Sequence, residues 1–161
     1  MLSEVFRLNN REGEHMTALV EWDDSLDLSG LVFIAHGLGG WRDQPLIQSA
    51  AEAFLKQGFR VVRYDATNSI GEAGGKFENA SATSFLHDLE DVLVWAADKE
   101  WYQEPFVLAG HSLGAMAAAL YAEEYPEKVK ALCLVAAVVS GKMSFSSERY
   151  REKMREWQER G

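Results

Sequence analysis

The chain has 161 residues, 47% of them hydrophobic, which is enough for one domain with a sizeable core. Its formal net charge of −9 disfavours nucleic acids and anionic membrane surfaces as partners, because both would repel it. The single cysteine, Cys133, excludes an internal disulfide, and the N-terminal residues show charges rather than an apolar leader, so we expect a cytoplasmic location.

The first half of the sequence predicts a hairpin followed by alternating strands and helices. Apolar and polar residues alternate over 4–8 and 17–22, which is typical of two half-buried strands. The continuous apolar run at 31–37 predicts a strand covered on both faces. Helical spacing over 44–58 predicts a helix that ends at Gly58, and a further strand is expected over 59–66. The apolar positions of this helix are Leu46, Ile47, Ala50, Ala51 and Leu55.

The second half continues the same alternation. A glycine-rich loop precedes a predicted helix over 81–96, whose apolar side chains share one face. A third buried strand is expected over 105–112, a small-residue helix over 113–126 and a fourth buried strand over 129–139. This order predicts an α/β fold with a mostly parallel sheet, helices on both faces and an antiparallel N-terminal hairpin. The longest apolar run, 131–139, is too short to cross a bilayer.

The five residues Gly110-His111-Ser112-Leu113-Gly114 lie where the third buried strand meets the small-residue helix. A turn this tight strains the serine backbone and lifts its hydroxyl above the sheet, and the flanking glycines avoid clashes with neighbouring main chain. The amide of Leu113, at the helix N-terminus, is expected to face negative charge that develops on a substrate carbonyl. The alternative is a serine that only caps the helix.

These motifs resemble those of the α/β-hydrolase superfamily, and within it the small serine-esterase and serine-peptidase-like branch that includes cinnamoyl (feruloyl) esterases. The sequence HGLGG at 36–40 matches the oxyanion-loop motif, GHSLG at 110–114 the nucleophile elbow, and 125–136 the segment leading into the following strand. The resemblance implies the N-terminal part of an α/β-hydrolase core in residues 1–142 and a lid-like charged helix in 143–161. This helix has a thin apolar stripe of Tyr150, Met154 and Trp157.

The resemblance also implies an activity and a site. It implies a carboxylesterase-type serine hydrolase for a small-molecule ester or related acyl substrate, with Ser112 as the nucleophile. The amides of Leu38 and Leu113 are then the oxyanion hole. No cofactor is implied, and the sequence holds no metal-binding motif. The remaining candidate pocket residues are His36, Gly37, Gly39 and His111.

One departure from the family pattern is local. The family's loop after the second buried strand runs Asp-x-Arg-Gly-x-Gly-x-Ser, whereas residues 65–75 keep Asp65 but lack the arginine and the serine. We expect Asp65 to hold loop amides rather than to take part in chemistry, because short acidic side chains commonly accept hydrogen bonds from turn N–H groups.

The other departure is the missing base. In this fold the acid and the histidine follow the serine in the chain, but residues 113–161 contain neither a histidine nor an aspartate. We expect a fold truncated after its sixth strand and the start of the lid, with little or no activity alone. The alternative is a non-catalytic remnant that binds a ligand or a partner chain. Because the fourth buried strand would lack its outer neighbour, self-association or a complementing chain is expected along 131–139.

The chain has four histidines, and we consider each as a replacement for the missing base. His36 is the only candidate, because it ends the strand expected beside that of the serine. His15 is expected to lie far from the carboxyl ends of the parallel strands, and His87 to pair with Asp91 on a solvated helix face. His111 is expected to pack structurally beside the nucleophile.

Overall fold

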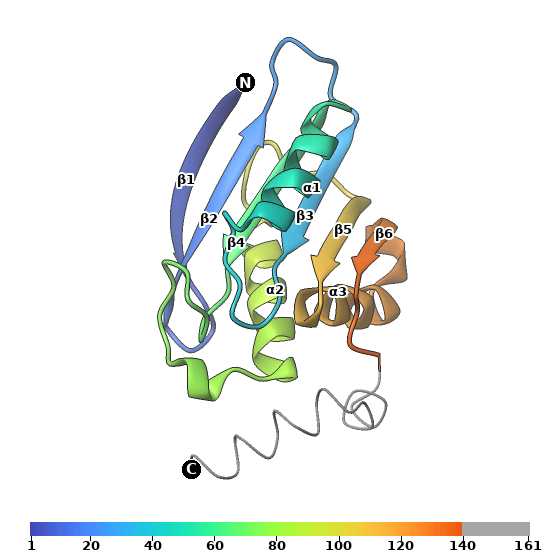
Figure 1. The fold of residues 1–161 in the computed structure, drawn as a ribbon. Helices are drawn as coiled ribbons and strands as arrows, with labels where there is room; N and C mark the ends of the chain where they lie inside the picture. Colours follow the sequence, from blue (N-terminus) through green and yellow to red (C-terminus); the bar gives the residue numbers. More distant parts are fainter. Residues whose placement is uncertain (140–161) are drawn as a thin grey trace.

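The computed structural model describes residues 1–139 and shows one six-stranded sheet in the order β1-β2-β4-β3-β5-β6 (Figure 1). The strands are β1 (Leu2–Asn9), β2 (His15–Trp22), β3 (Gly30–Ala35), β4 (Phe59–Asp65), β5 (Phe106–His111) and β6 (Val129–Val135). The helices are α1 (Pro45–Leu55), α2 (Ala82–Ala97) and α3 (Leu113–Glu124), with short 3-10 turns at Phe77–Asn79 and Pro126–Lys128.

The pairing confirms a mostly parallel sheet with an N-terminal hairpin. Strands β4, β3, β5 and β6 are parallel, and β1 and β2 form an antiparallel hairpin. The hairpin joins the sheet through β2, which runs antiparallel to β4, so that Thr17 lies opposite Asp65. The turn between β1 and β2 therefore lies at the edge where the parallel strands end, at the bottom of Figure 1.

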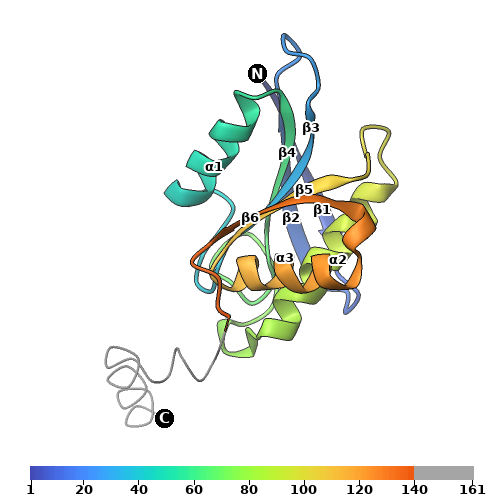
Figure 2. The same ribbon diagram turned by 90° about the vertical axis from the view of Figure 1, so that its right-hand side faces the viewer.

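Helices cover both faces, as the sequence predicts. Helix α1 lies on one face of the sheet, and α2 and α3 lie on the other (Figure 2). Alternate residues of β3 enter the two cores because successive strand side chains point to opposite faces. Phe33 joins the core under α2 and α3, whereas Val32 and Ile34 join the core under α1. The continuous apolar run thus corresponds to a strand that is buried on both faces.

The helix boundaries follow local signals in the sequence. Helix α1 starts with Pro45 in its first turn, where the missing N–H removes no intrahelical bond. Helix α2 starts after Ser81, whose side chain accepts a hydrogen bond from the Ser84 N–H in a capping box. The sequence places Leu46 on the buried face of α1, but 41% of this residue is exposed, because the buried stripe follows residues four apart. That stripe consists of Ile47, Ala51 and Leu55.

The prediction of a fourth buried strand over 129–139 is wrong in two respects. Strand β6 ends at Val135, because Ala136 adopts a left-handed φ of 50° that an extended strand cannot contain. Its apolar side chains are also exposed rather than buried, whereas its place at the edge of the sheet in the described part of the chain confirms that it lacks an outer neighbour there. A continuous apolar run predicts that other elements pack on both faces of the strand. The run itself does not show which elements these are.

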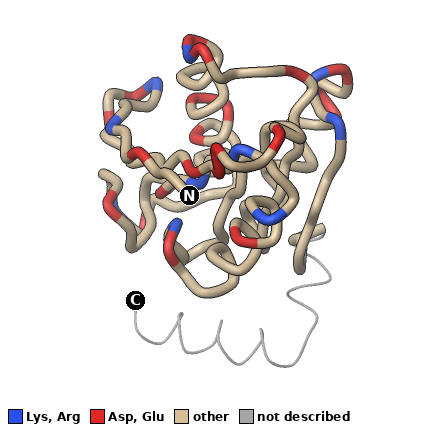
Figure 3. Tube along the Cα trace, turned by 90° about the horizontal axis from the view of Figure 1, so that it is seen from above, with Lys and Arg blue, Asp and Glu red and all other residues tan. Residues whose placement is uncertain are grey.

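Charged residues are dispersed over the described surface. Figure 3 shows acidic and basic positions interspersed over several segments of the trace. Among residues 1–139, every helix is too short or too polar to serve as a membrane span. The lid-like helix expected in 143–161 lies outside the described residues.

Candidate active site

Ser112 forms the whole connection between β5 and α3. Strand β5 ends at His111 and α3 begins at Leu113, so the chain turns from strand to helix within one residue. Ser112 adopts φ 54° and ψ −115°, a backbone conformation that side chains other than hydrogen rarely take. Such a residue stores roughly 1–3 kcal/mol of strain and persists only where its surroundings fix it. The strained turn expected from the sequence is therefore present.

The two glycines that flank Ser112 allow backbone to approach backbone. A Cβ atom on Gly110 would lie 2.6 Å from the Ala115 nitrogen. A Cβ atom on Gly114 would lie 2.4 Å from the carbonyl oxygens of Ala35 and His36. Both distances are far below van der Waals contact. Glycine at these positions lets α3 pack directly on β5 and on the end of β3, as the motif predicts.

The loop after β3 packs against the serine. A Cβ atom on Gly37 would lie 2.8 Å from the Ser112 Cβ and 3.0 Å from the His111 carbonyl oxygen. The Gly40 N–H donates to the Gly37 carbonyl oxygen (2.9 Å), which closes a turn with Leu38 and Gly39 at its tip. Leu38 is 46% exposed there. The structure thus brings the HGLGG segment and the serine turn into direct contact.

Two backbone N–H groups at this corner differ in their availability. The Ser112 N–H donates to the carbonyl oxygen of Val135 (3.0 Å), so it is already bonded. Leu113 is the first residue of α3, and the first N–H groups of a helix have no intrahelical acceptor. The helix dipole adds partial positive charge at the same point. A negatively charged oxygen above Ser112 would therefore meet the amide of Leu113 rather than that of Ser112.

His36 is held in place by the backbone and cannot act as a base. Its Nδ1 lies 2.8 Å from the Gly37 carbonyl oxygen, and its Nε2 accepts a hydrogen bond from the Ala66 N–H (3.0 Å). These contacts fix the neutral ring with its proton on Nδ1. The side chain is buried, and burial lowers the pKa of His36. Because both ring nitrogens are engaged, the hypothesis that His36 substitutes for the missing base is wrong.

Two other histidines differ from expectation, His15 in its position and His87 in its partner. His15 was expected far from the carboxyl ends of the parallel strands, yet its carbonyl oxygen accepts from the Gly74 N–H (2.8 Å) in the loop after β4. The reason is the antiparallel pairing of β2 with β4, which brings the start of β2 to this edge. His87 has no ion pair with Asp91 in the described structure, since Asp91 instead pairs with Arg11 (2.9 Å).

His111 packs beside the serine, as expected. Its Nδ1 would lie 3.1 Å from a Cβ atom on Gly37, so the ring contacts the loop after β3. This nitrogen is buried and has no hydrogen-bond partner among residues 1–139. The histidine therefore fills space between the loop and the serine turn.

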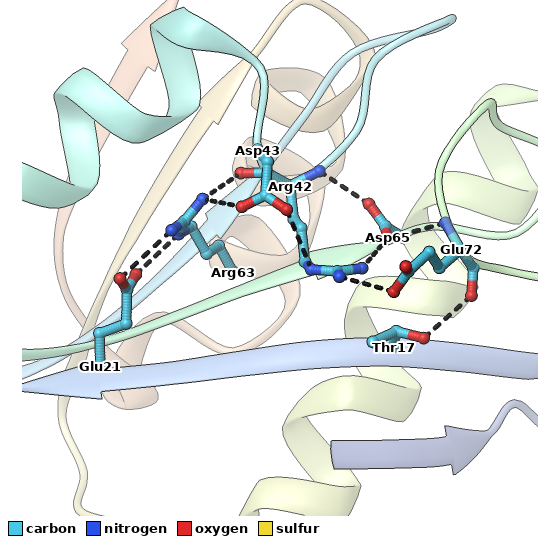
Figure 4. Close-up of polar contacts among 7 residues, drawn as sticks. All are labelled: Thr17, Glu21, Arg42, Asp43, Arg63, Asp65 and Glu72. Carbon is cyan, nitrogen blue, oxygen red and sulfur yellow. Dashed lines mark hydrogen bonds and ion pairs between the residues drawn. The ribbon is translucent and has the colours of Figure 1, made fainter. Parts of the chain in front are cut away.

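Asp65 holds the loop after β3 and the loop after β4 together (Figure 4). Its carboxylate accepts hydrogen bonds from the Arg42 N–H (2.7 Å) and the Glu72 N–H (2.9 Å), and it also pairs with the Arg42 guanidinium. The prediction that Asp65 binds loop amides is confirmed. The sequence reasoning did not find Arg42, because its partner lies 23 residues away and no local pattern marks the pair.

A second arginine extends this network along the sheet. Arg63 of β4 donates to the Arg42 carbonyl oxygen (2.7 Å) and pairs with Asp43 (2.6 Å) and with Glu21 of β2 (2.7 Å). In the part of the chain that the structure describes, no three His, Cys, Asp or Glu side chains gather as a metal site would require. The carboxylates of this network thus bind arginines and backbone amides.

A serine in a strained turn between a parallel strand and a helix, on a sheet with helices on both faces, gives this chain the architecture of the α/β-hydrolase fold. The family model described as "Serine aminopeptidase, S33" matches residues 27–160, and the chain belongs to this family. None of the curated protein sequences matches it significantly.

Several solved structures are similar in fold. Est1E from Butyrivibrio proteoclasticus, solved with ferulic acid bound, is 22% identical with a TM-score of 0.76 over 89% of this chain and 57% of that one. The α/β hydrolase GrgF from Penicillium sp. sh18 is 18% identical with a TM-score of 0.75 over 99% and 53%. The mouse α/β hydrolase domain-containing protein 10 is 19% identical with a TM-score of 0.73 over 96% and 59%. The chain therefore spans just over half the length of these structures.

Proposed function

We propose that this chain carries the nucleophile and the oxyanion hole of a carboxylesterase-type serine hydrolase. Ser112 is the nucleophile, and the amides of Leu38 and Leu113 hold the oxyanion. The observation that carries the proposal is the strained backbone of Ser112, against which Gly37 packs so closely that any larger residue would collide. Strain of this kind clusters at active sites, where it is part of the mechanism.

The chemistry needs a proton acceptor. In the proposed reaction the Ser112 oxygen bonds to the ester carbonyl carbon, the carbonyl electrons move to its oxygen, and the hydroxyl proton passes to a base. The intermediate then collapses, the alcohol leaves with a proton, and water hydrolyses the acyl-enzyme. Both ring nitrogens of His36 are occupied, and residues 113–161 hold no histidine or aspartate. The base and its acid therefore come from sequence outside this chain or from a second chain.

The comparisons suggest which substrates to test first. Est1E was solved with ferulic acid bound, so esters of small aromatic acids are the first choice. The family description names a serine aminopeptidase, so aminoacyl amides are the second class of substrate to test. Both substrate classes react through the same attack on a carbonyl carbon.

Partners and location complete the proposal. The exposed edge strand β6 favours a second copy or a complementing chain along residues 131–139, because unpaired strand edges bind other strands. Residues 143–161 are proposed as a lid-like helix beyond the core of 1–142. A cytoplasmic setting rests on the single Cys133, which has no second cysteine to pair with.

The test is covalent labelling of Ser112 by a fluorophosphonate probe, with and without imidazole as an external base. We expect slow labelling that imidazole accelerates, and that Ser112→Ala abolishes. Ser3→Ala, on the exposed strand β1, is the matched control and should label like the unchanged chain. Hydrolysis of p-nitrophenyl acetate without imidazole should stay near the residual level, about 10³–10⁴ over water, of enzymes that lack triad members. Equal labelling of Ser112→Ala would overturn the proposal and favour a non-catalytic remnant that binds a ligand or partner.

A further inference from the structure

We propose that Arg42 is a positioning residue that fixes the oxyanion loop, defined as residues 36–44, against Ser112. The inference rests on the proposed function, since it assigns a role within the same site. Arg42 does not reach the reacting atoms. Its role is to keep the Leu38 amide in place by anchoring the loop four residues further along the chain.

The first element of the anchor is a buried ion pair with Asp65. Arg42 is 8% exposed and Asp65 is 1% exposed. Asp65 binds Arg42 twice, through the backbone N–H (2.7 Å) and through the guanidinium. The loop backbone and its side chain are thus bound to the same carboxylate at the end of β4, as Figure 4 shows. Removing one partner of a buried pair leaves an uncompensated charge and is strongly destabilising.

The second element is a closed ring of contacts through the loop after β4. The Arg42 guanidinium also pairs with Glu72 (2.6 Å), whose own N–H donates to Asp65 (2.9 Å). The Glu72 carbonyl oxygen accepts from the Thr17 hydroxyl on β2 (2.9 Å). Arg63 donates a hydrogen bond to the Arg42 carbonyl oxygen (2.7 Å). Arg42 is therefore held by contacts with β4 and with the loop after β4, and this loop is itself bonded to β2.

The oxyanion loop consists of two successive turns, and the anchor acts on the second. The Gly40 N–H closes the first turn onto Gly37 (2.9 Å), and the Gln44 N–H closes the second onto Trp41 (3.2 Å). Arg42 lies in the second turn. When Arg42 is released, the first turn is still held by β3, by the His36 Nδ1 contact with the Gly37 carbonyl oxygen (2.8 Å) and by the contact of Gly37 with Ser112, but it loses its connection to the end of β4, so the turn that carries Leu38 can open more often.

Lysine cannot fully replace arginine at this position. The planar guanidinium reaches three carboxylates at once, Asp65 with Nη1, Glu72 with Nη2 and, at a longer distance of 3.5 Å, Asp43 with Nε. A lysine ammonium is a single point charge and can keep only one of these pairs in the same geometry. The series arginine, lysine, glutamine therefore removes the anchor in steps.

The test measures amide hydrogen exchange at Gly40, whose N–H is protected only while the first turn is closed. Arg42→Gln should speed this exchange at least tenfold, and Arg42→Lys by an intermediate factor. The matched control is Arg60→Gln, at the other end of β4, where the guanidinium lies between the rings of Trp22 (5.1 Å) and Trp101 (5.8 Å). Arg60→Gln should lower stability without a specific change at Gly40. Equal acceleration in Arg42→Gln and Arg60→Gln overturns the proposal.

Two further measurements keep every outcome decisive. If Arg42→Gln does not fold, Glu72→Gln removes only the ion pair of Arg42 with the exposed Glu72 and should still speed Gly40 exchange two- to threefold. Unchanged exchange in both Glu72→Gln and Arg42→Lys then overturns the proposal. Fluorophosphonate labelling of Ser112 in imidazole should slow in the same order as Gly40 exchange rises. If Ser112 never labels while Gly40 exchange follows the series, the proposed function fails and the anchoring role of Arg42 stands.

Discussion

Replacing Gly37 with alanine tests how closely the oxyanion loop approaches the serine. The added methyl group would lie 2.8 Å from the Ser112 Cβ and 3.0 Å from the His111 carbonyl oxygen. Carbon atoms in contact are about 3.5–4.0 Å apart, so the loop or the serine turn must move by about 1 Å. Overpacking of this kind costs about 1–3 kcal/mol, which corresponds to a fall in Tm of roughly 2–12 °C for a chain of this size. A displacement of 1 Å at a reacting group can slow a reaction roughly 100-fold.

The assay combines thermal unfolding with fluorophosphonate labelling of Ser112 in imidazole. Gly13→Ala is the matched control, because Gly13 has a φ of 81° and open space around its Cβ position. Alanine there costs about 1–2 kcal/mol through its left-handed backbone but touches nothing near the serine. We expect both variants to lose stability and only Gly37→Ala to lose labelling. Labelling of Gly37→Ala at the rate of Gly13→Ala would refute the close approach.

Three other predictions use the same features. Gly114→Ala puts a methyl group 2.4 Å from two backbone oxygens, so we expect a loss of stability at or above about 3 kcal/mol in urea unfolding, and an unchanged midpoint would contradict this. Because burial lowers the pKa of His36, the unfolded chain binds this proton at higher pH, and stability should fall as the pH drops below about 6.5. His36→Asn should remove up to about 1.4 kcal/mol per pH unit from that slope, and identical slopes would refute the assignment. Cys133 is exposed on β6, so it should react fully with Ellman's reagent at low protein concentration. If β6 binds a second copy of the chain, the reaction should be slower at high protein concentration. A rate that does not depend on concentration, together with a monomer in sedimentation, contradicts the second copy as partner.

Much of the fold could be predicted because its signals are local. The run at 31–37 is apolar at successive positions, and in the structure these side chains fill cores on both sides of the sheet. The glycines of the GHSLG motif predict a strained turn, and Ser112 adopts φ 54°. By contrast, the apolar run in β6 predicts burial, which depends on an outer neighbour that lies outside the run itself.

The features that were missed depend on pairing between distant segments. The position of His15 follows from the antiparallel pairing of β2 with β4, and neither strand carries a pattern that names its partner. Asp65 could be assigned to loop amides from its residue type, but the cation beside it comes from Arg42 on another loop. The occupied ring of His36 depends on the Ala66 N–H, 30 residues away. Single-sequence reasoning assigns chemistry to residue types, and only the fold determines which groups already have partners.

The hydrogen bond from the Ser112 N–H to the Val135 carbonyl oxygen (3.0 Å) has a mechanical consequence. Strands β5 and β6 are parallel, and their last paired residues are His111 and Val135. The end of the edge strand is therefore bonded directly to the backbone of Ser112, the residue that follows His111. A pulling force applied at Val135 therefore acts directly on Ser112, whose backbone is already strained. A tether at β1 reaches Ser112 through several intervening elements, β2, β4 and β3 within the sheet and α2 beside it, and these share the load. Immobilisation of the chain on a surface through β1 would thus leave the serine turn unstressed, and immobilisation just beyond Val135 would pull on it directly.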